Sequence, residues 1–404
     1  MKILFFCHYY APEGAAGGIR ATALTERWAA AGHEVTVVTC VPNYPNGVPY
    51  EGYRNKRCEE TINGVRVVRV KTYIAENKGV LKRMFFYFSY FCSALWASLW
   101  LSKPDVVVAS SPHIFAGYAG VWYHRLKRVP LVMEVRDIWP ESIIAVGAKI
   151  PKLGFLVLEA IEKSMYRVCQ RLVVLGEGYR ARLIEKGVPA DKMEMVMNGT
   201  NLEKFYPQEK DASILRKYGL EDKFVVSYIG AVGMACGLSV VLDAAEKMKD
   251  KAVKFVIVGD GAQRSSLESS AKERCLDNVV FAGKQPPVDM PKWVASSDAC
   301  LVHLRKTDLF TTVMPSKVFE AAGCKRPIIM GVDGYAKKLV LDAKAGLDMA
   351  PEDADSLVSC VEKLISDSKL CRQLGENSYE NIAKVHNRDQ QAKDYLVILR
   401  KVVK

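Results

Sequence analysis

The sequence contains few histidines and no closely paired cysteines. Its six histidines are dispersed, with no two at a spacing that would ligate one metal ion, so we predict no structural metal. Its 11 cysteines occur singly, without a Cys-x-x-Cys motif. Cys7, Cys40 and Cys300 lie in apolar runs, where a reduced thiol packs as a small hydrophobic side chain. These absences argue against a disulfide framework and favour a reducing cytoplasm.

Targeting segments and long apolar runs are also lacking. The apolar run at residues 2–7 is too short for a signal peptide, and no cleavage signature follows it. Residues 85–101 carry no charge but include three serines, and they fall short of the roughly 20 apolar residues of a spanning helix. We expect either a buried helix or a helix on a membrane surface, with its aromatic rings in the lipid interface and Lys82 and Arg83 at anionic headgroups.

The acidic residues are outnumbered, mainly in the first half of the chain. Lysine and arginine total 57 against 45 acidic residues, a net charge of +12, and most of the surplus lies before residue 201. A nucleic-acid coat would be more uniformly or more strongly basic. We therefore expect no nucleic-acid partner, and one domain that faces something acidic.

A length of 404 residues suits two or three domains. Short apolar runs alternate with helical patterns, and the series starts again after an Asn198-Gly199 turn that leads to Pro207. Such runs are typical of parallel strands covered on both faces. The sequence thus predicts an α/β protein with two Rossmann-like domains facing a central cleft, over residues 1–203 and 204–385. A last helix over residues 386–404 is expected to return to the first domain.

Glycine-rich turns mark candidate anion sites in both domains. Gly17 and Gly18 follow the first strand, and Gly230 and Gly233 follow the first strand of the second domain. Glycines let a backbone come close to a ligand, and a helix N-terminus offers free N–H groups to an anion. Neither turn is the dinucleotide fingerprint, which argues against an NAD oxidoreductase. Plain flexible loops remain the alternative.

A later helix start combines several suitable side chains. Pro315 and Ser316 favour the start of a helix, and Lys317 adds a positive charge for a diphosphate. Glu320, one turn further on, is placed to accept both hydroxyls of a ribose. The alternative is an ordinary capped helix.

Charged side chains gather where the fifth strand of the first domain ends. Glu134, Arg136 and Asp137 lie at this carboxyl end, where open α/β sheets bind ligands. Asp137 or Ser142 could instead simply cap the next helix. His113, after the fourth strand, is expected to point toward the cleft, unless it is an ordinary loop residue.

These motifs together resemble those of the family 4 glycosyltransferases, which are retaining enzymes of the GT-B fold. The resemblance covers essentially the whole chain and is most specific at residues 136–142, Arg-Asp-Ile-Trp-Pro-Glu-Ser. The Gly17–Arg20 loop and Pro315–Lys317 with Glu320 add to it. Bacterial O-antigen and capsule transferases that use UDP-N-acetyl sugars, such as the N-acetyl-fucosamine type, are the most similar in these motifs.

The resemblance implies a nucleotide-sugar donor, a lipid-linked acceptor and no cofactor or bound metal. The acceptor would be a polyprenyl-diphosphate-linked glycan in lipopolysaccharide or other polysaccharide synthesis, and the enzyme would lie peripherally on the inner face of the cell membrane. Asp137 and Arg136 would be catalytic, with Asp137 facing the transferred sugar or the acceptor hydroxyl. Arg20, His113 and Glu134 would bind acceptor or sugar. The nucleotide and diphosphate would meet Gly17, Gly18, Gly230, Gly233, Gly283, Lys284, Ser316, Lys317 and Glu320.

Two positions depart from the family pattern. Thr312 stands at the first acid of the Glu-x7-Glu pair, and Met234 stands where many relatives carry a basic residue. Loss of this cation removes several kcal/mol of electrostatic stabilisation of the leaving diphosphate, unless Lys317 or Arg264 replaces it. The rival functions are a UDP-sugar 2-epimerase and a non-catalytic member of a glycan assembly complex, and the two departures favour the second.

Overall fold

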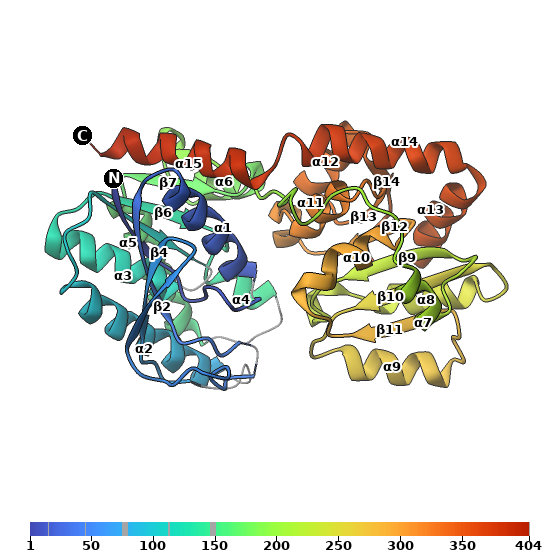
Figure 1. Ribbon diagram of the computed structural model, residues 1–404, viewed down its shortest axis with the longest axis horizontal. Coiled ribbons are helices and arrows are strands. Elements are labelled where there is room, and N and C mark those ends of the chain that lie inside the picture. The colour runs from blue at the N-terminus through green and yellow to red at the C-terminus, as the bar shows by residue number, and fades with distance from the viewer. Residues whose placement is uncertain (15, 45, 75–79, 112–113, 146–150, 404) are drawn as a thin grey trace. The chain divides into compact units, whose positions relative to one another are not determined.

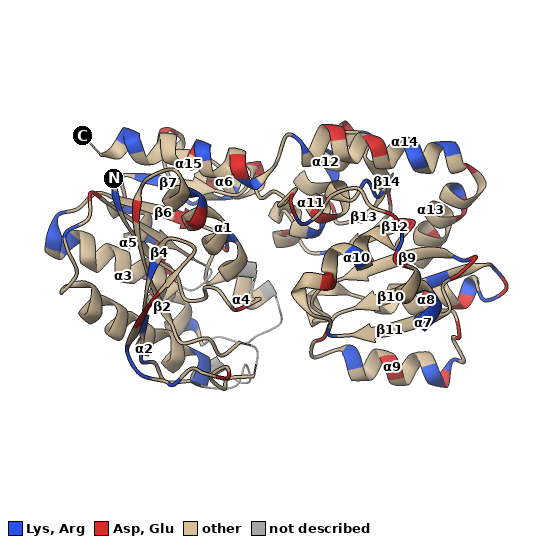
Figure 2. Ribbon diagram, in the orientation of Figure 1, with Lys and Arg blue, Asp and Glu red and all other residues tan. Residues whose placement is uncertain are grey.

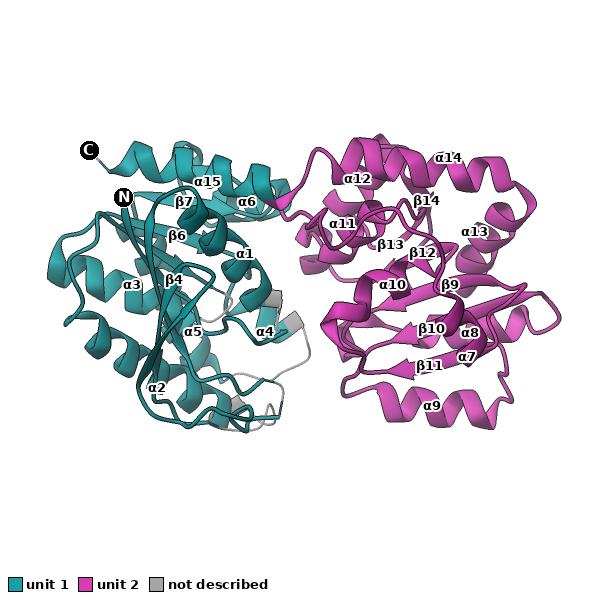
Figure 3. Ribbon diagram, viewed as in Figure 1, with its two compact units in different colours: residues 1–197, 389–404 teal, residues 198–388 magenta. Residues whose placement is uncertain are grey.

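The computed structural model describes residues 1–14, 16–44, 46–74, 80–111, 114–145 and 151–403. The chain divides into two compact units, and Figure 3 shows them in separate colours. Unit 1 comprises residues 1–197 and 389–404, and unit 2 comprises residues 198–388. The chain therefore passes from unit 1 to unit 2 after residue 197, before the predicted boundary at residue 203. Thr200 already belongs to unit 2, where it forms a β-bridge with Asn387.

Unit 1 is built on an eight-stranded sheet in the order β3-β4-β2-β1-β5-β6-β7-β8. Every neighbouring pair is parallel except β3 and β4. The central strands are buried along almost their whole length, as expected for a sheet covered on both faces. The strands are β1 (Lys2–Phe6), β2 (Glu34–Cys40), β3 (Cys58–Ile62), β4 (Val65–Val70), β5 (Val106–Ser110), β6 (Leu131–Val135), β7 (Arg171–Val174) and β8 (Met193–Met195).

Helices cover the two faces of this sheet and form two separate cores. Side chains from α2, α3 and α5 pack with one set of strand residues, and those of α1 and α15 pack with the alternate set. Figure 1 shows α15 running close to α1 in unit 1. The helices are α1 (Ala16–Ala30), α2 (Val80–Ser98), α3 (Ile114–Lys127), α4 (Glu141–Ala145), α5 (Lys152–Val168), α6 (Glu177–Glu185) and α15 (Arg388–Val402), with a short 3-10 turn η1 (Ala190–Lys192).

Unit 2 carries a six-stranded parallel sheet in the order β11-β10-β9-β12-β13-β14. Its strands are β9 (Phe224–Ile229), β10 (Val253–Val258), β11 (Val279–Gly283), β12 (Ala299–His303), β13 (Ile328–Gly331) and β14 (Gly346–Asp348). Its helices are α7 (Ala212–Tyr218), α8 (Ser239–Lys247), α9 (Arg264–Glu273), α10 (Met290–Ala295), α11 (Ser316–Gly323), α12 (Tyr335–Asp342), α13 (Ala354–Ser366) and α14 (Ser368–Ser378). Short turns are η2 (Met234–Cys236), η3 (Pro287–Asp289), η4 (Leu309–Thr312) and the π-helical η5 (Tyr379–Ala383). Both units are therefore Rossmann-like, and the α/β GT-B expectation is confirmed at the level of fold.

The last helix belongs to unit 1 although unit 2 precedes it in the chain. The indole N–H of Trp28 donates to the carbonyl oxygen of Ala392 at 3.1 Å, and the Trp28 and Tyr395 rings lie 5.1 Å apart. Both side chains are fully buried. α15 thereby completes one of the two cores of unit 1.

The uncharged run at residues 85–101 lies mostly in α2, which has one buried and one exposed face. Phe86, Tyr90 and Ala94 are buried against the sheet, and the Tyr90 hydroxyl donates to the carbonyl oxygen of Val38 at 2.7 Å. Trp96 and Trp100 are 66% and 71% exposed. Within the described ranges no helix has both the length and the hydrophobicity to cross a bilayer.

Candidate functional site

The carboxyl edge of the unit 2 sheet is lined by glycines at three neighbouring strand ends. Gly230, Gly259 and Gly283 follow or end β9, β10 and β11, and all three have positive φ angles. The Gly259 N–H donates to the carbonyl oxygen of Gly283 at 2.9 Å, and the Gly230 N–H donates to Val258 at 2.8 Å. A Cβ at Gly259 would lie 1.9 Å from the carbonyl oxygen of Gly230. The Gly259 backbone is thus too close to that of Gly230 for a side chain, whereas added Cβ atoms at Gly230 and Gly283 would meet the ends of the Lys317 and Arg264 side chains. Glycines at these strand ends allow a ligand to approach the backbone.

Lys317 reaches this glycine row from the first turn of α11. A Cβ at Gly230 would lie 2.7 Å from Lys317 Nζ, and the amine lies 4.8 Å from the centre of the Tyr228 ring. Pro315 precedes Ser316 at the helix start, and no side chain caps the first-turn N–H groups. Pro315, at the N-cap position, thus makes no capping hydrogen bond to the first turn. The Val318 N–H donates to the carbonyl oxygen of Pro315 at 3.3 Å. The Lys317 amine and the backbone N–H groups of Ser316 and Lys317 are the donors that this helix start offers to a phosphate.

Glu320 follows Lys317 by one turn and is partly buried. Burial raises the pKa of its carboxyl, while the charges of Lys317 and Arg388 oppose that shift. The described part of the chain offers its carboxylate no hydrogen bond or ion pair. A partly buried acceptor without a partner is suited to a ligand's hydroxyl groups.

The remaining predicted residues of unit 2 surround the glycine row less closely. Gly233 precedes η2, with nothing within 4 Å of a Cβ placed on it. Met234 is 49% exposed. Lys284 is exposed and follows Gly283. Thr312 donates its hydroxyl to the carbonyl oxygen of Leu309 at 2.7 Å, within η4, so this side chain serves its own turn.

Arg264 is the other cation considered for the diphosphate, and it is already engaged. Its Nε donates to Glu268 at 2.7 Å, and its guanidinium also lies 3.9 Å from Asp260. A Cβ at Gly283 would meet it at 3.1 Å. Lys317 makes no ion pair with any described residue, whereas Arg264 pairs with Glu268. Lys317 is therefore the better placed of the two cations to meet a diphosphate.

In unit 1, Gly17 and Gly18 lie in the first turn of α1 rather than in a loop. The sequence predicts a glycine-rich turn here, but α1 already begins at Ala16. A Cβ at Gly18 would lie 3.3 Å from the backbone nitrogen of Tyr10, so the helix start packs tightly on the preceding loop. Arg136 Nη1 donates to the carbonyl oxygen of Gly17 at 2.9 Å. This contact joins the helix start to the end of β6.

Asp137 stands next to Arg136 and is partly buried. Burial raises the pKa of its carboxyl to about 6, although the positive charge of Arg136 lowers that pKa. The carboxylate lines a small cavity together with Ser111, Trp139 and Glu162. A carboxyl with a pKa near neutrality is suited to orient a hydroxyl or to take its proton.

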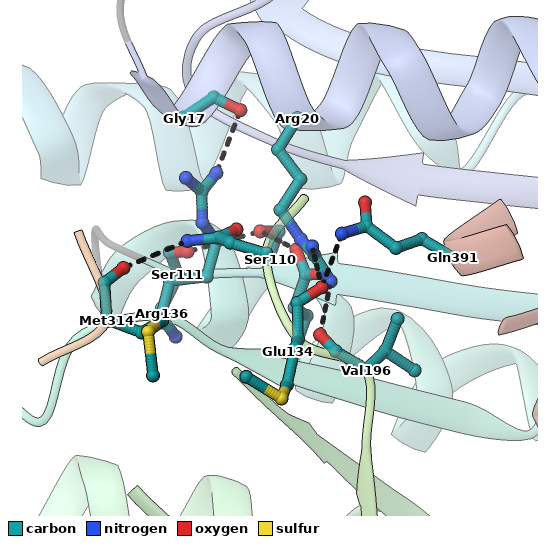
Figure 4. A network of polar contacts seen from close by, with 11 residues as sticks. Gly17, Arg20, Ser110, Ser111, Glu134, Arg136, Val196, Met314 and Gln391 are labelled. Carbon is teal, nitrogen blue, oxygen red and sulfur yellow. Dashed lines mark hydrogen bonds and ion pairs between the residues drawn. The ribbon is translucent and has the colours of Figure 1, made fainter. Parts of the chain in front are cut away.

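Glu134 and Arg20 form an internal network instead of lining a sugar site (Figure 4). Arg20 Nε donates to Glu134 Oε1 at 2.9 Å, and the Ser110 hydroxyl donates to Glu134 Oε2 at 2.7 Å. Arg20 also donates to the backbone carbonyls of Val196 at 3.0 Å and Met197 at 3.1 Å. Burial alone would raise the pKa of Glu134, but the Arg20 and Arg136 charges and the Ser110 hydroxyl lower it.

The side chains of Glu134 and Arg20 are 0% and 5% exposed, so the structure assigns them a role that differs from the predicted one. They connect α1 and β6 to the segment where the chain leaves unit 1. Met197 also accepts from Gln391 Nε2 at 2.6 Å, at the start of the returning helix. His113, the third predicted acceptor residue, lies outside the described residues.

Glu13 is a buried acid that the sequence patterns do not single out as a site residue. Its Oε1 accepts from the backbone N–H groups of Asn43 at 2.7 Å and Tyr44 at 2.8 Å. Burial raises the pKa of this carboxyl to about 7, against those N–H groups and Arg69. It fastens the loop after β1 to the loop after β2. Only its position beside the glycine turn could have drawn attention to it.

Family models cover most of the chain. The model described as "Glycosyl transferase 4-like domain" matches residues 16–199, and "Glycosyl transferases group 1" matches residues 210–381. The chain belongs to the family 4 glycosyltransferases. The part of the prediction that names the family is confirmed, whereas the N-acetyl-fucosamine type is not.

Individual relatives agree with this assignment. The glycosyltransferase is 28% identical over 375 residues to the putative colanic acid biosynthesis glycosyl transferase WcaI of Escherichia coli K12, covering 90% of this chain and 88% of WcaI. Its fold resembles that of sucrose-phosphate synthase from Thermosynechococcus elongatus, with a TM-score of 0.77, 17% identity and coverage of 99% and 98%. HepE of Anabaena in complex with UDP-glucose gives a TM-score of 0.72 at 16% identity, with coverage of 98% and 100%.

No group of three or more His, Cys, Asp or Glu side chains that could hold a metal ion occurs in the portion of the glycosyltransferase described above. The groups described above in each unit are carboxylates, cations and backbone amides. Unit 2 offers a phosphate-binding arrangement and a free carboxylate, and unit 1 offers Asp137 beside Arg136.

Proposed function

We propose that this glycosyltransferase moves a sugar from a UDP-activated N-acetyl sugar to a polyprenyl-diphosphate-linked glycan, with retention and without a bound metal. Peripheral attachment to the inner face of the cell membrane is part of the proposal. The similarity to WcaI, whose name refers to colanic acid biosynthesis, supports a role in bacterial surface polysaccharide synthesis. The complex of HepE with UDP-glucose supports a nucleotide-sugar donor.

The observation that carries the proposal is the group at the unit 2 sheet edge. The glycine row leaves backbone exposed to a diphosphate, and Lys317 supplies a charge beside it. Glu320, which has no hydrogen-bond or ion-pair partner in the described chain, would accept the two ribose hydroxyls. Ser316, Gly233 and the Gly283–Lys284 turn would complete the contacts to the nucleotide.

The transfer would follow a front-face course. The acceptor hydroxyl attacks the anomeric carbon on the side from which UDP departs, through an oxocarbenium-like state. The leaving diphosphate accepts the hydroxyl proton, and Lys317 stabilises the charge that develops on it. Asp137 orients the acceptor hydroxyl, and Arg136 holds the α1 start through Gly17.

Calorimetry with UDP tests the donor site. Glu320→Gln and Lys317→Ala should each weaken UDP binding about 10- to 100-fold, the value of one lost charge-assisted hydrogen bond. Lys338→Ala is the matched control, since Lys338 is 72% exposed and paired with Asp342. Unchanged affinity in both variants would refute the proposed donor site.

Turnover separates the rival functions. Sugar transfer from UDP-N-acetyl sugars to a synthetic prenyl-diphosphate glycan should continue in the presence of EDTA and fall in Asp137→Asn. Isomerised donor in the absence of acceptor would indicate an epimerase. UDP binding with no turnover of any donor would indicate a non-catalytic assembly protein, the function that Met234 and Thr312 favour.

A further inference from the structure

The outer surface of α2 and α3 exposes an unusual number of aromatic rings. On α2 and in the turn after it, Phe85, Phe88, Trp96 and Trp100 are 65%, 50%, 66% and 71% exposed. They recur every three, eight and four residues along α2 and the turn after it, so they share one side of the helix. Soluble surfaces rarely expose contiguous apolar areas of this kind without a partner.

Ring contacts join this stripe to α3. Phe88 lies 5.8 Å from Phe115, and Phe91 lies 5.5 Å from Tyr118. Tyr118 in turn lies 6.2 Å from Trp122, and α3 ends with the exposed Leu126. We call this surface the aromatic face, comprising Phe85, Phe88, Phe91, Trp96, Trp100, Phe115, Tyr118, Trp122 and Leu126.

The other side of α2 fixes the helix to the sheet. Tyr90 and Ala94 are completely buried, and the Tyr90 hydroxyl bonds to β2. The aromatic face thus lies on a helix that the core holds in place, and its members Phe91, Phe115 and Tyr118 are partly buried against that core. Contact with a partner would require no unfolding.

The charges on the two helices have one sign. Neither α2 nor α3 contains an acidic residue; Lys82 and Arg83 lie in the first turn of α2, and Arg125 and Lys127 lie at the end of α3. The Arg125 guanidinium stacks over the Trp122 ring at 5.6 Å. In Figure 2 both helices are tan along most of their length. Cations at the rim of an aromatic surface match the anionic headgroups and the interfacial layer of a bilayer.

We propose that the aromatic face is the surface by which this enzyme lies on an anionic lipid bilayer. The rings enter the interfacial layer, and Lys82, Arg83, Arg125 and Lys127 meet lipid phosphates. Acidic side chains, which would repel anionic headgroups, are absent from the sequences of both helices. This inference rests on the proposed function and deepens it, because it assigns the membrane contact to a surface that α2 and α3 form together.

Vesicle flotation tests it with the full chain. The protein should float with vesicles of phosphatidylglycerol and phosphatidylcholine and much less with vesicles of phosphatidylcholine alone. The double variant Trp96→Ser and Trp100→Ser should lower the partition coefficient at least about tenfold. Val288→Ser is the matched control, because Val288 is 79% exposed on unit 2. Lys82→Gln with Arg125→Gln should lower binding only to the anionic vesicles.

Equal flotation of the tryptophan double variant and the parent would overturn the proposal. So would a parent protein that ignores vesicles but forms a dimer, in sedimentation equilibrium, that the same variant dissociates. UDP calorimetry on the double variant distinguishes a failure of this membrane proposal from a failure of the proposed function. Its UDP affinity should equal that of the parent, since neither tryptophan belongs to the donor site.

Discussion

Replacing Glu134 by glutamine should destabilise unit 1 without affecting the acceptor site. Glu134 is completely buried, and Arg20 donates to it at 2.9 Å. Removing one partner of a buried ion pair costs about 3–5 kcal/mol, because the other charge stays behind unpaired. The neighbouring Arg136 adds to this cost, since it also lies in the field of the Glu134 charge. We expect a loss near the lower end of that range, because the amide oxygen still accepts from Arg20.

Arg20→Met should cost more than Glu134→Gln. It strands the carboxylate and also removes the donors to the carbonyls of Val196 and Met197. The double variant Arg20→Met and Glu134→Met should lose less than the sum of the two single losses, since it leaves no unpaired charge of this pair. Urea unfolding, followed by circular dichroism and by tryptophan fluorescence, measures all the differences.

The pH dependence of stability gives an independent check on the same pair. The folded protein holds the pKa of Glu134 below its ordinary value. Its contribution to stability is therefore present above that ordinary value and is lost as the pH falls through the lowered pKa. Glu134→Gln should reduce the loss of stability on acidification. A free-energy change below about 1 kcal/mol, combined with a raised KM for acceptor, would refute the structural role and restore the sugar-binding one.

Two further predictions concern the proposed catalytic carboxylate and the glycine row. The kcat/KM of transfer should fall as the pH drops through about 6, because the raised pKa of Asp137 leaves its carboxyl protonated below that pH. Arg136→Gln should shift this acidic limb of the pH profile to higher pH, because the Arg136 charge lowers the pKa of Asp137. An acidic limb that does not shift in this variant would belong to another group, such as Glu13. Gly259→Ala should lose about 3 kcal/mol or more, because its Cβ would overlap the Gly230 carbonyl, whereas Gly233→Ala should unfold like the parent in a thermal melt. Equal melting of the two variants would contradict the close packing of the glycine row.

The repeated alternation of apolar runs and helical patterns was enough to predict both sheets. The strands of the central part of each sheet are buried on both faces, and their sequences are correspondingly apolar. Three edge strands, β3, β8 and β14, escaped prediction. β3 is antiparallel, Cys-Glu-Glu-Thr-Ile, with alternate residues exposed, and β8 and β14 have only three residues each. An edge strand with one face in solvent lacks the continuous apolar signal.

The site was predictable where function depends on the local backbone and not where it depends on tertiary partners. Gly230 and Lys317 were found because a glycine turn and a helix start are local signals, and they do come together. Glu134 looks the same as Asp137 in the sequence, since both are acids at a strand end. Only the tertiary contacts show that Arg20 and Ser110 occupy both oxygens of Glu134. Glu13 was missed for the same reason, since its partners lie 30 residues away.

The return of the C-terminal helix affects the order in which a ribosome can deliver a finished fold. Residues 198–388 form a continuous segment and hold all of unit 2, so this unit can close while the rest of the chain is still being made. Unit 1 emerges first but must wait for Ala392 and Tyr395 to cover Trp28. During that interval the Trp28 indole and its apolar surroundings stay uncovered. The N-terminal part of the nascent chain is then open to chaperone binding and to aggregation.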